Sequence, residues 1–139
     1  MSVKIISDVH GKWQDYLNII SDGMPSIQIG DFGFNYSFLD TENVNQEKHR
    51  GFLGNHDNHD NWNYPHFFGK YGAINHYGLE AFYVGGAWSI DWKYREQQRV
   101  NGIWPKTWWS NEELSEQEIL ACKVLYNEIK PYIVLSHCC

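Results

Sequence analysis

Cysteine and proline are scarce in this chain of 139 residues, with three and four copies. The cysteines are Cys122, Cys138 and Cys139, and an odd count that includes two neighbours gives no disulfide framework. We therefore expect a reducing compartment. The chain also lacks a signal-peptide pattern at its start, and no stretch approaches the roughly 20 apolar residues of a membrane helix. These absences predict a cytoplasmic protein without a membrane partner.

Positive charge is also in short supply. Lys and Arg number 11 against 17 Asp and Glu, which gives a net charge of −6 at pH 7. Binding to nucleic acid relies on clustered Lys and Arg, so nucleic acid is not indicated as a partner. Two divalent ions would offset about four of these charges locally, which leaves a phosphate ligand open. With 17% aromatic and 20% charged residues, the composition is that of a globular protein. The length favours one domain over residues 1–139.

Short apolar runs predict four buried strands, at residues 3–7, 27–30, 51–54 and 132–135. Apolar side chains at helical spacing predict a helix over residues 13–21. A second helix begins at the capping-box pair Ser115 and Glu118 and ends before Pro131. Strands that alternate with helices favour an α/β fold.

The middle of the chain is less regular. Residues 73–76 and 80–84 predict a hairpin, because a turn-like Tyr-Gly-Leu separates them. Residues 34–50 and 58–72 are expected to be loops, the first with limited helix. Residues 88–112 carry five of the seven tryptophans without a clear period, and we expect a long loop or lid there.

Each of the four strands ends in a polar cluster. The clusters are Asp8-Val9-His10-Gly11, Gly30-Asp31, Gly54-Asn55-His56-Asp57 and Ser136-His137. Ligands of open α/β sheets bind beyond the carboxyl ends of the strands, so these clusters can converge on one site. Oxygen and imidazole groups without thiolates suit a hydrolytic divalent-metal centre better than a zinc finger.

The order of these motifs resembles that of the calcineurin-like metallophosphoesterases. The segment from Gly85 to Asp91, followed by Arg95, Trp108-Trp109 and Glu112-Glu113, is also similar to the small bacterial and phage-type members of the family. Gly30-Asp31 continues as Phe-Gly and not as the Asp-Arg-Gly of the protein Ser/Thr phosphatases, which weighs against a phosphoprotein phosphatase. The resemblance implies two stacked sheets flanked by helices. It also implies hydrolysis of phosphate mono- or diesters by a metal-activated hydroxide.

The resemblance implies a metal ligand set as well. Asp8 and His10 match ligands of one ion, Asn55 and His137 match ligands of a second, and Asp31 matches the carboxylate that bridges both. Up to two divalent ions are implied, and such ligands suit manganese, iron, zinc or nickel.

Further residues match catalytic or substrate-binding positions. His56 corresponds to the histidine that protonates the leaving group, and Asp57 would orient its imidazole. Arg95 or Arg99 could clamp substrate phosphate, although solvated roles are commoner for such arginines. The remaining histidines, and Asp60, are not assigned to the site. We expect His59 and Asp60 in a solvated loop, and surface or structural roles for His49, His66 and His76.

One family motif, Gly-His-x-His, does not occur in this sequence. In the family its two histidines each complete one metal site. We therefore expect a C-terminally shortened form of the fold, with an open sheet edge that could pair with a second copy of the chain. Three functional hypotheses stay open: an active phosphoesterase, a weakly active or inactive relative that binds metal or a phosphate ligand, and a purely structural or interaction protein.

Overall fold

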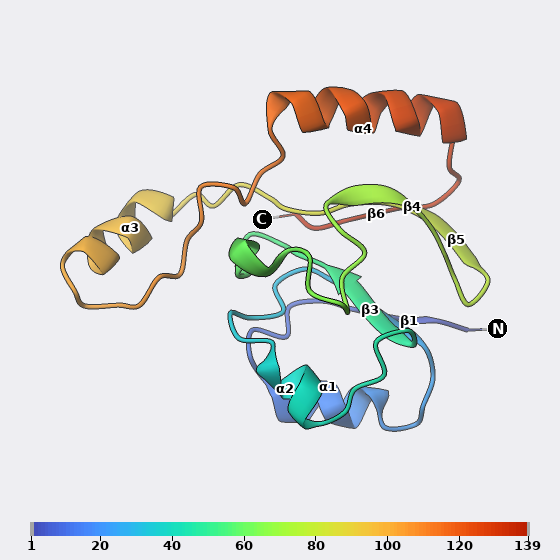
Figure 1. Ribbon diagram of the computed structural model, residues 1–139, viewed down its shortest axis with the longest axis horizontal. Coiled ribbons are helices and arrows are strands. Elements are labelled where there is room, and N and C mark those ends of the chain that lie inside the picture. The colour runs from blue at the N-terminus through green and yellow to red at the C-terminus, as the bar shows by residue number, and fades with distance from the viewer. Residues whose placement is uncertain (1, 139) are drawn as a thin grey trace.

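The first of two small sheets is parallel and carries the N-terminal half of the chain. The computed structural model describes residues 2–138 (Figure 1). Strands β1 (Lys4–Ile6), β2 (Ser26–Ile29) and β3 (His49–Phe52) pair in the order β1-β2-β3, all in parallel. Helix α1 (Trp13–Ile20) connects β1 to β2, and the short α2 (Ser37–Thr41) lies between β2 and β3. The predicted strand and helix positions here are confirmed to within a few residues.

The second sheet joins a central hairpin to the C-terminal strand. Strands β4 (Tyr71–His76) and β5 (Leu79–Val84) are antiparallel, and β6 (Val134–Ser136) runs parallel to β5. Tyr77 and Gly78 both have positive φ, as a two-residue hairpin turn requires. Helix α4 (Glu116–Ile129) begins at the complete capping box of Ser115 and Glu118. The α/β class is therefore confirmed, with two sheets and four α-helices among the described residues.

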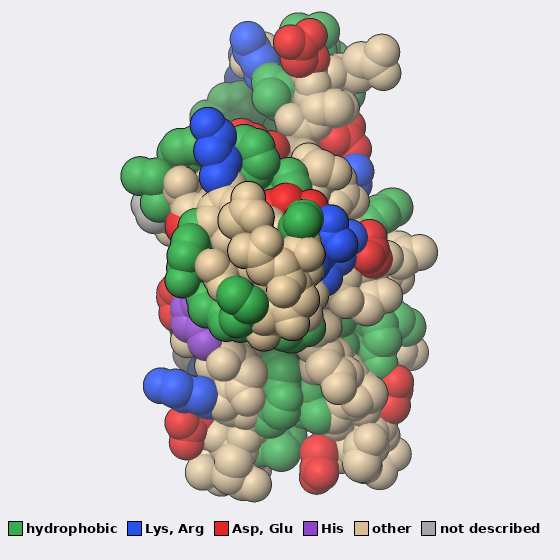
Figure 2. All heavy atoms as spheres, turned by 90° about the vertical axis from the view of Figure 1, so that its left-hand side faces the viewer, with side chains coloured by type: hydrophobic (Ala, Val, Ile, Leu, Met, Phe, Trp, Pro, Cys, Tyr) green, Lys and Arg blue, Asp and Glu red, His purple; other side chains and the backbone are tan. Residues whose placement is uncertain are grey.

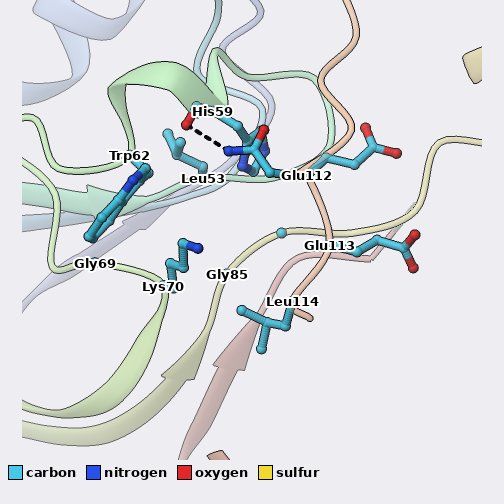
Figure 3. Close-up of a pocket in the computed structure, with 11 residues that line it drawn as sticks. Leu53, His59, Trp62, Gly69, Lys70, Gly85, Glu112, Glu113 and Leu114 are labelled. Atoms are coloured by element: carbon cyan, nitrogen blue, oxygen red, sulfur yellow. Dashed lines mark hydrogen bonds between the residues drawn. The ribbon is translucent and has the colours of Figure 1, made fainter. Parts of the chain in front are cut away.

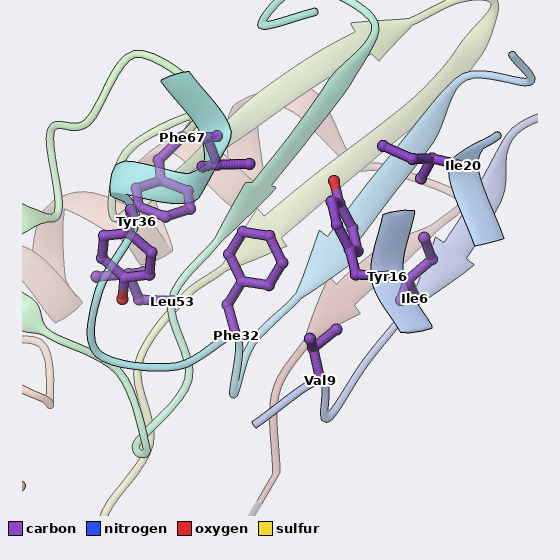
Figure 4. Close-up of a cluster of buried hydrophobic side chains, with 9 residues drawn as sticks. Ile6, Val9, Tyr16, Ile20, Phe32, Tyr36, Leu53 and Phe67 are labelled. Atoms are coloured by element: carbon purple, nitrogen blue, oxygen red, sulfur yellow. The ribbon is translucent and has the colours of Figure 1, made fainter. Parts of the chain in front are cut away.

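Two apolar clusters hold these layers together. The first lies between α1, α2 and the first sheet, with Phe32 between Tyr16 and Tyr36 (Figure 4). The second joins the two sheets: Ile27 and Phe52 of the first pack with Tyr83 of the second. Burying a side chain of this size contributes about 1.5–3 kcal/mol. Figure 1 shows the resulting order, with α1 and α2 outermost on one side and α4 on the other.

The expectation of a long loop over residues 88–112 is wrong in part. Residues Trp92–Val100 form helix α3, which projects away from the sheets (Figure 1). None of its residues is buried. A helix that packs no face against a core needs no apolar period, so the pattern that reveals helices was missing from its sequence.

A second correction concerns the segment 58–72. Residues His59–Asn61 form a short 3₁₀ helix, η1, and His59 is buried, not solvated. Asp60 is exposed, and it accepts a hydrogen bond from Trp109 Nε1 at 2.8 Å. Cys122 is buried on α4, whereas Cys139 lies outside the described residues. Among residues 2–138, no helix is both long and apolar enough to cross a bilayer.

Candidate metal centre

The segments that follow β1, β2, β3 and β6 meet at one end of the sheets. Five of the predicted ligands and His56 line an open cavity of about 390 Å³ there: Asp8, His10, Asp31, Asn55, His56 and His137. They come from positions up to 129 residues apart in the chain, from Asp8 to His137. The side chains that follow separate strands therefore converge as their positions predicted.

Asp31 lies at the centre of this group. Its Oδ2 is 2.8 Å from His56 Nδ1 and 3.6 Å from His10 Nε2, and its Oδ1 is 3.1 Å from His137 Nε2. Burial opposes ionisation of the carboxyl group, but hydrogen bonds from His137 and His56 outweigh it and hold the pKa of Asp31 well below its usual range. Asp31 is thus an ionised carboxylate whose two oxygens face different histidines.

Two sets of side chains offer ligand atoms close enough together to hold an ion. One set is His10, Asp31 and His56, and the other is Asp8, Asp31 and His137. Asp31 belongs to both, which is the position expected of a bridge. The division otherwise differs from the expected one. His56 stands among the ligand atoms of one set, and Asp8 groups with His137, although Asp8 Oδ1 is also 3.4 Å from His10 Nε2.

Asn55 supplies a test of whether this site fits a cation. Its side chain is 3% exposed, and its Nδ2 donates a hydrogen bond to Ser89 Oγ at 3.2 Å. Its Oδ1 is buried without a hydrogen-bond partner among the described residues. Buried polar atoms are nearly always paired, so an unpaired amide oxygen beside carboxylates and imidazoles fits a divalent ion as its partner.

The orientation of Asn55 depends on a buried pair that sequence reasoning did not assign. Ser89 donates from its backbone N and its Oγ to the two oxygens of Glu112, both at 2.7 Å. Burial raises the pKa of Glu112. Ser89 and Glu112 both lie in segments that carry the family resemblance, and that resemblance was the one sequence feature that could have pointed to them. They come from opposite ends of the 88–112 segment, so only the folded chain shows that they bond.

Close packing at the centre explains Gly54. A Cβ atom at this position would lie 2.5 Å from Asp31 Oδ1 and 2.8 Å from His137 Cδ2. Any larger residue would therefore push Asp31 or His137 out of place. The turns themselves are unusual too, because Asp8, His10 and Asp31 all have positive φ. Such backbone costs about 1–3 kcal/mol per residue and is concentrated at functional sites.

Asp57 has a different role from the expected one. Its carboxylate is fully buried and accepts hydrogen bonds at 2.6–2.8 Å from the backbone N–H groups of Asp31, Phe32, Gly33 and Gly54. It therefore ties the turn after β2 to the turn after β3. The imidazole of His56 is bonded by Asp31 instead, at Nδ1. Burial raises the pKa of Asp57 to about 6.

The two candidate arginines lie in different surroundings. Arg95 donates from Nε to Asp91 Oδ2 at 2.8 Å and from Nη1 to the Thr107 carbonyl at 2.9 Å. It lines a second cavity next to the metal centre. Arg99 bonds to Glu96 and is exposed. Arg99 lines neither cavity, so the structure places Arg95 at the cavity beside the metal centre and leaves Arg99 apart.

The other histidines are buried and structural. Those at positions 49, 66 and 76 bond to Ser26 Oγ and to the carbonyls of Val44 and Lys48, respectively. His59 bonds through Nε2 to the Gly54 carbonyl at 2.6 Å, and so supports the turn after β3 from behind.

A pocket behind this turn, lined in part by Leu53, Trp62, Lys70 and Glu112, is shown in Figure 3. Its volume is about 10 Å³, which is room for about one water. The cavity at the metal centre is therefore the better candidate for a ligand site.

The chain matches no model of a known protein family, and it matches no curated protein. A function for this site is therefore inferred from its own residues.

Proposed function

We propose that this chain is a metal-dependent phosphoesterase that hydrolyses phosphate mono- or diesters. The observation that supports this most is the position of Asp31, because one of its oxygens lies 3.6 Å from His10 Nε2 and the other lies 3.1 Å from His137 Nε2, so that a single carboxylate faces an expected ligand of each ion. In ester hydrolysis by paired metals the two ions lie about 3.5–4 Å apart, and a carboxylate shared by both is one way to hold that separation. The proposal includes the metallophosphoesterase form of the two-sheet fold, and a cytoplasmic location.

The proposal assigns a role in metal binding to each of these side chains. Asp8, His10, Asn55 and His137 would hold two divalent ions, and Asp31 would be a ligand that both ions share. When bound, such ions stabilise charge on phosphoryl oxygens and lower the pKa of water from 15.7 toward about 7. His137 is fixed for this purpose because its Nδ1 bonds to the Ile29 carbonyl at 3.0 Å, which directs Nε2 at Asp31.

His56 has a position suited to proton transfer. Its Nδ1 is engaged by Asp31, and its ring lines both cavities with 29% of the side chain exposed. Nε2 is then the atom that exchanges a proton with a ligand. We assign to His56 the protonation of the leaving alkoxide.

The test combines metal stoichiometry with turnover. Protein loaded with manganese is assayed for bound metal and for hydrolysis of bis(p-nitrophenyl) phosphate. We expect Asp31→Asn to lose more metal than His137→Ala, because Asp31 belongs to both ligand sets and His137 to one. His56→Ala should lower turnover by about 10²-fold or more. Asp15→Asn, which makes an acid-to-amide change at an exposed site on α1, serves as the control.

Two results would contradict the proposal. The absence of both bound metal and turnover would exclude a metalloenzyme. Small and equal losses in Asp31→Asn and His137→Ala would exclude Asp31 as the shared ligand.

The alternative is a module that binds metal or a phosphate ligand without turnover. The observation that favours it is the small size of each ligand set, which offers three acidic or imidazole side chains per ion. A ligand that prefers the native state raises its stability. Thermal stabilisation by manganese without hydrolysis would therefore support the alternative.

A further inference from the structure

Residues 88–112, here called the arm, form one wall beside the candidate metal centre. The arm carries α3 and projects from the two sheets (Figure 1). Figure 2 looks toward it and shows hydrophobic side chains gathered there, with histidine side chains beside its base. The exposed apolar residues of the arm include Trp88, Ile90, Tyr94, Val100, Ile103 and Trp104.

A second cavity lies under the arm and continues the metal centre. Its volume is about 320 Å³, within the range of roughly 300–1,000 Å³ that is usual for ligand pockets. His10 and His56 line this cavity as well as the cavity at the metal centre. A phosphate ester whose phosphorus lies beside these histidines could therefore extend an attached group under the arm.

Two large aromatic side chains form part of the wall of this second cavity. Phe34 and Trp104 line it, and they are 37% and 42% exposed. Each ring is held by another: Phe34 lies 5.5 Å from the Trp109 ring, and Trp104 meets Tyr94 edge to face at 5.4 Å. Large aromatic surfaces that stay partly exposed while their positions are fixed are suited to stack on a flat ligand.

The polar residues of the cavity keep its wall in place. Arg95 bonds to Asp91 at the start of α3 and to the Thr107 carbonyl in the loop that follows α3, and all three residues line the cavity. Trp104 lies between Arg95 and Thr107 in the chain, so the bond between these two residues restrains its position. A site that is formed before the ligand arrives loses less free energy on ordering.

We propose that this second cavity binds the aromatic base of a nucleoside phosphate ester, so that small nucleotides are the preferred substrates of the phosphoesterase site. The proposal rests on the function proposed above. A long polynucleotide is disfavoured as the ligand because the chain has a net charge of −6 and its partner would be a polyanion.

The test measures binding with two probes that differ in the base alone. The probes are the methylene phosphonate analogues of adenosine 5′-monophosphate and of ribose 5-phosphate, in which no ester bond can be hydrolysed. Calorimetric titration of the manganese-loaded protein should show that the adenosine analogue binds at least about 5-fold more tightly, since stacking on an aromatic side chain contributes about 1–3 kcal/mol.

Matched tryptophan variants locate the effect. Trp104→Ala should remove most of the preference for the adenosine analogue and leave the affinity for the ribose analogue unchanged. Trp104→Phe should retain part of it. Trp88→Ala is the control, because Trp88 is on the same arm and 47% exposed but lines neither cavity.

The outcomes separate this inference from the function on which it rests. Equal affinities for the two analogues, or a preference that Trp104→Ala leaves intact, would overturn the inference about the second cavity alone. Failure of both analogues to bind, together with an absence of bound manganese and of diester hydrolysis, would overturn the phosphoesterase proposal and this inference with it.

Discussion

Single carboxylates in this chain acquire different chemistry from their surroundings. Asp31 and Asp57 both follow strands, and both are buried. Asp31 faces imidazoles, and hydrogen bonds from them lower its pKa. Asp57 faces backbone N–H groups, and its deeper burial raises its pKa. One is thus available to a cation, and the other is a structural acceptor. The family resemblance implied a metal role for Asp31 and an orienting role for Asp57, and only the folded chain shows that Asp57 bonds to backbone instead.

Asp57→Asn should destabilise the fold by about 1.5–3 kcal/mol, the usual contribution of hydrogen bonds to a charged group. The reason is that an amide nitrogen would replace one acceptor oxygen opposite backbone donors. Urea unfolding in the presence of a metal chelator measures this loss. Asp15→Asn makes the same chemical change at an exposed site on α1 and should alter the unfolding free energy by less than about 0.5 kcal/mol.

His49 should make stability depend on pH. Burial lowers the pKa of His49 to about 4, against about 6.5 in the unfolded chain. Below pH 6.5 the unfolded state binds the proton more readily, so the free energy of unfolding should fall by about 1–3 kcal/mol as the pH drops from 6.5 toward 4. Burial lowers the pKa of His59 and His76 in the same direction.

Urea unfolding of wild-type protein and His49→Gln across this pH range tests the assignment. The variant should show a flatter dependence on pH, although His59 and His76 keep it from being level. Parallel curves for the two proteins would show that His49 does not contribute.

Helices that carry a local sequence signal were predictable, and the helix without one was missed. Helix α1 buries Tyr16 and Ile20 at helical spacing, and α4 begins at a complete capping box, so both left a local signal. No residue of helix α3 is fully buried, and Arg95 ties the helix to a carbonyl 12 residues further along the chain. That bond has no counterpart in any local pattern.

The arm should therefore loosen when Arg95 is replaced. We expect Arg95→Gln to increase cleavage by trypsin at Lys106 under native conditions, because the bonds to Asp91 and Thr107 are lost. Arg99→Gln is the matched control, since among residues 2–138 the hydrogen bonds of Arg99 go to Glu96 on its own helix. Both variants lose one trypsin site in α3, so a comparison at Lys106 is fair. Equal rates in the two variants would contradict a bracing role for Arg95.

At the scale of the whole molecule, one side of the second sheet is open. Within residues 2–138, β6 pairs with β5 alone and forms an edge of that sheet. Apolar side chains near this edge are exposed, among them Tyr132, Ile133 and Val134. Unprotected edges of this kind favour pairing with another chain. We therefore expect the protein to form homo-oligomers through β6.

Val134→Lys should weaken this association, because a lysine on an edge strand opposes pairing. Sedimentation velocity over a range of protein concentrations should show a shift toward monomer of about 5-fold or more in the dissociation constant. Val100→Lys places the same change on the exposed end of α3, away from β6, and should have no effect. Wild-type protein that is monomeric at all concentrations would exclude the edge as an interface.

The sequence by itself determined the α/β class, the order of the strands along the chain, the hairpin and the set of polar side chains that meet beyond the strand ends. Each of these follows from a local cause: an apolar run, a turn residue, a cap or the end of a strand. The tertiary structure alone decided that Asp57 binds backbone, that Ser89 and Glu112 support Asn55, that His59 is buried and that α3 exists. These features depend on contacts between residues far apart in the chain, and burial and hydrogen bonds of that kind leave no periodic trace in the sequence.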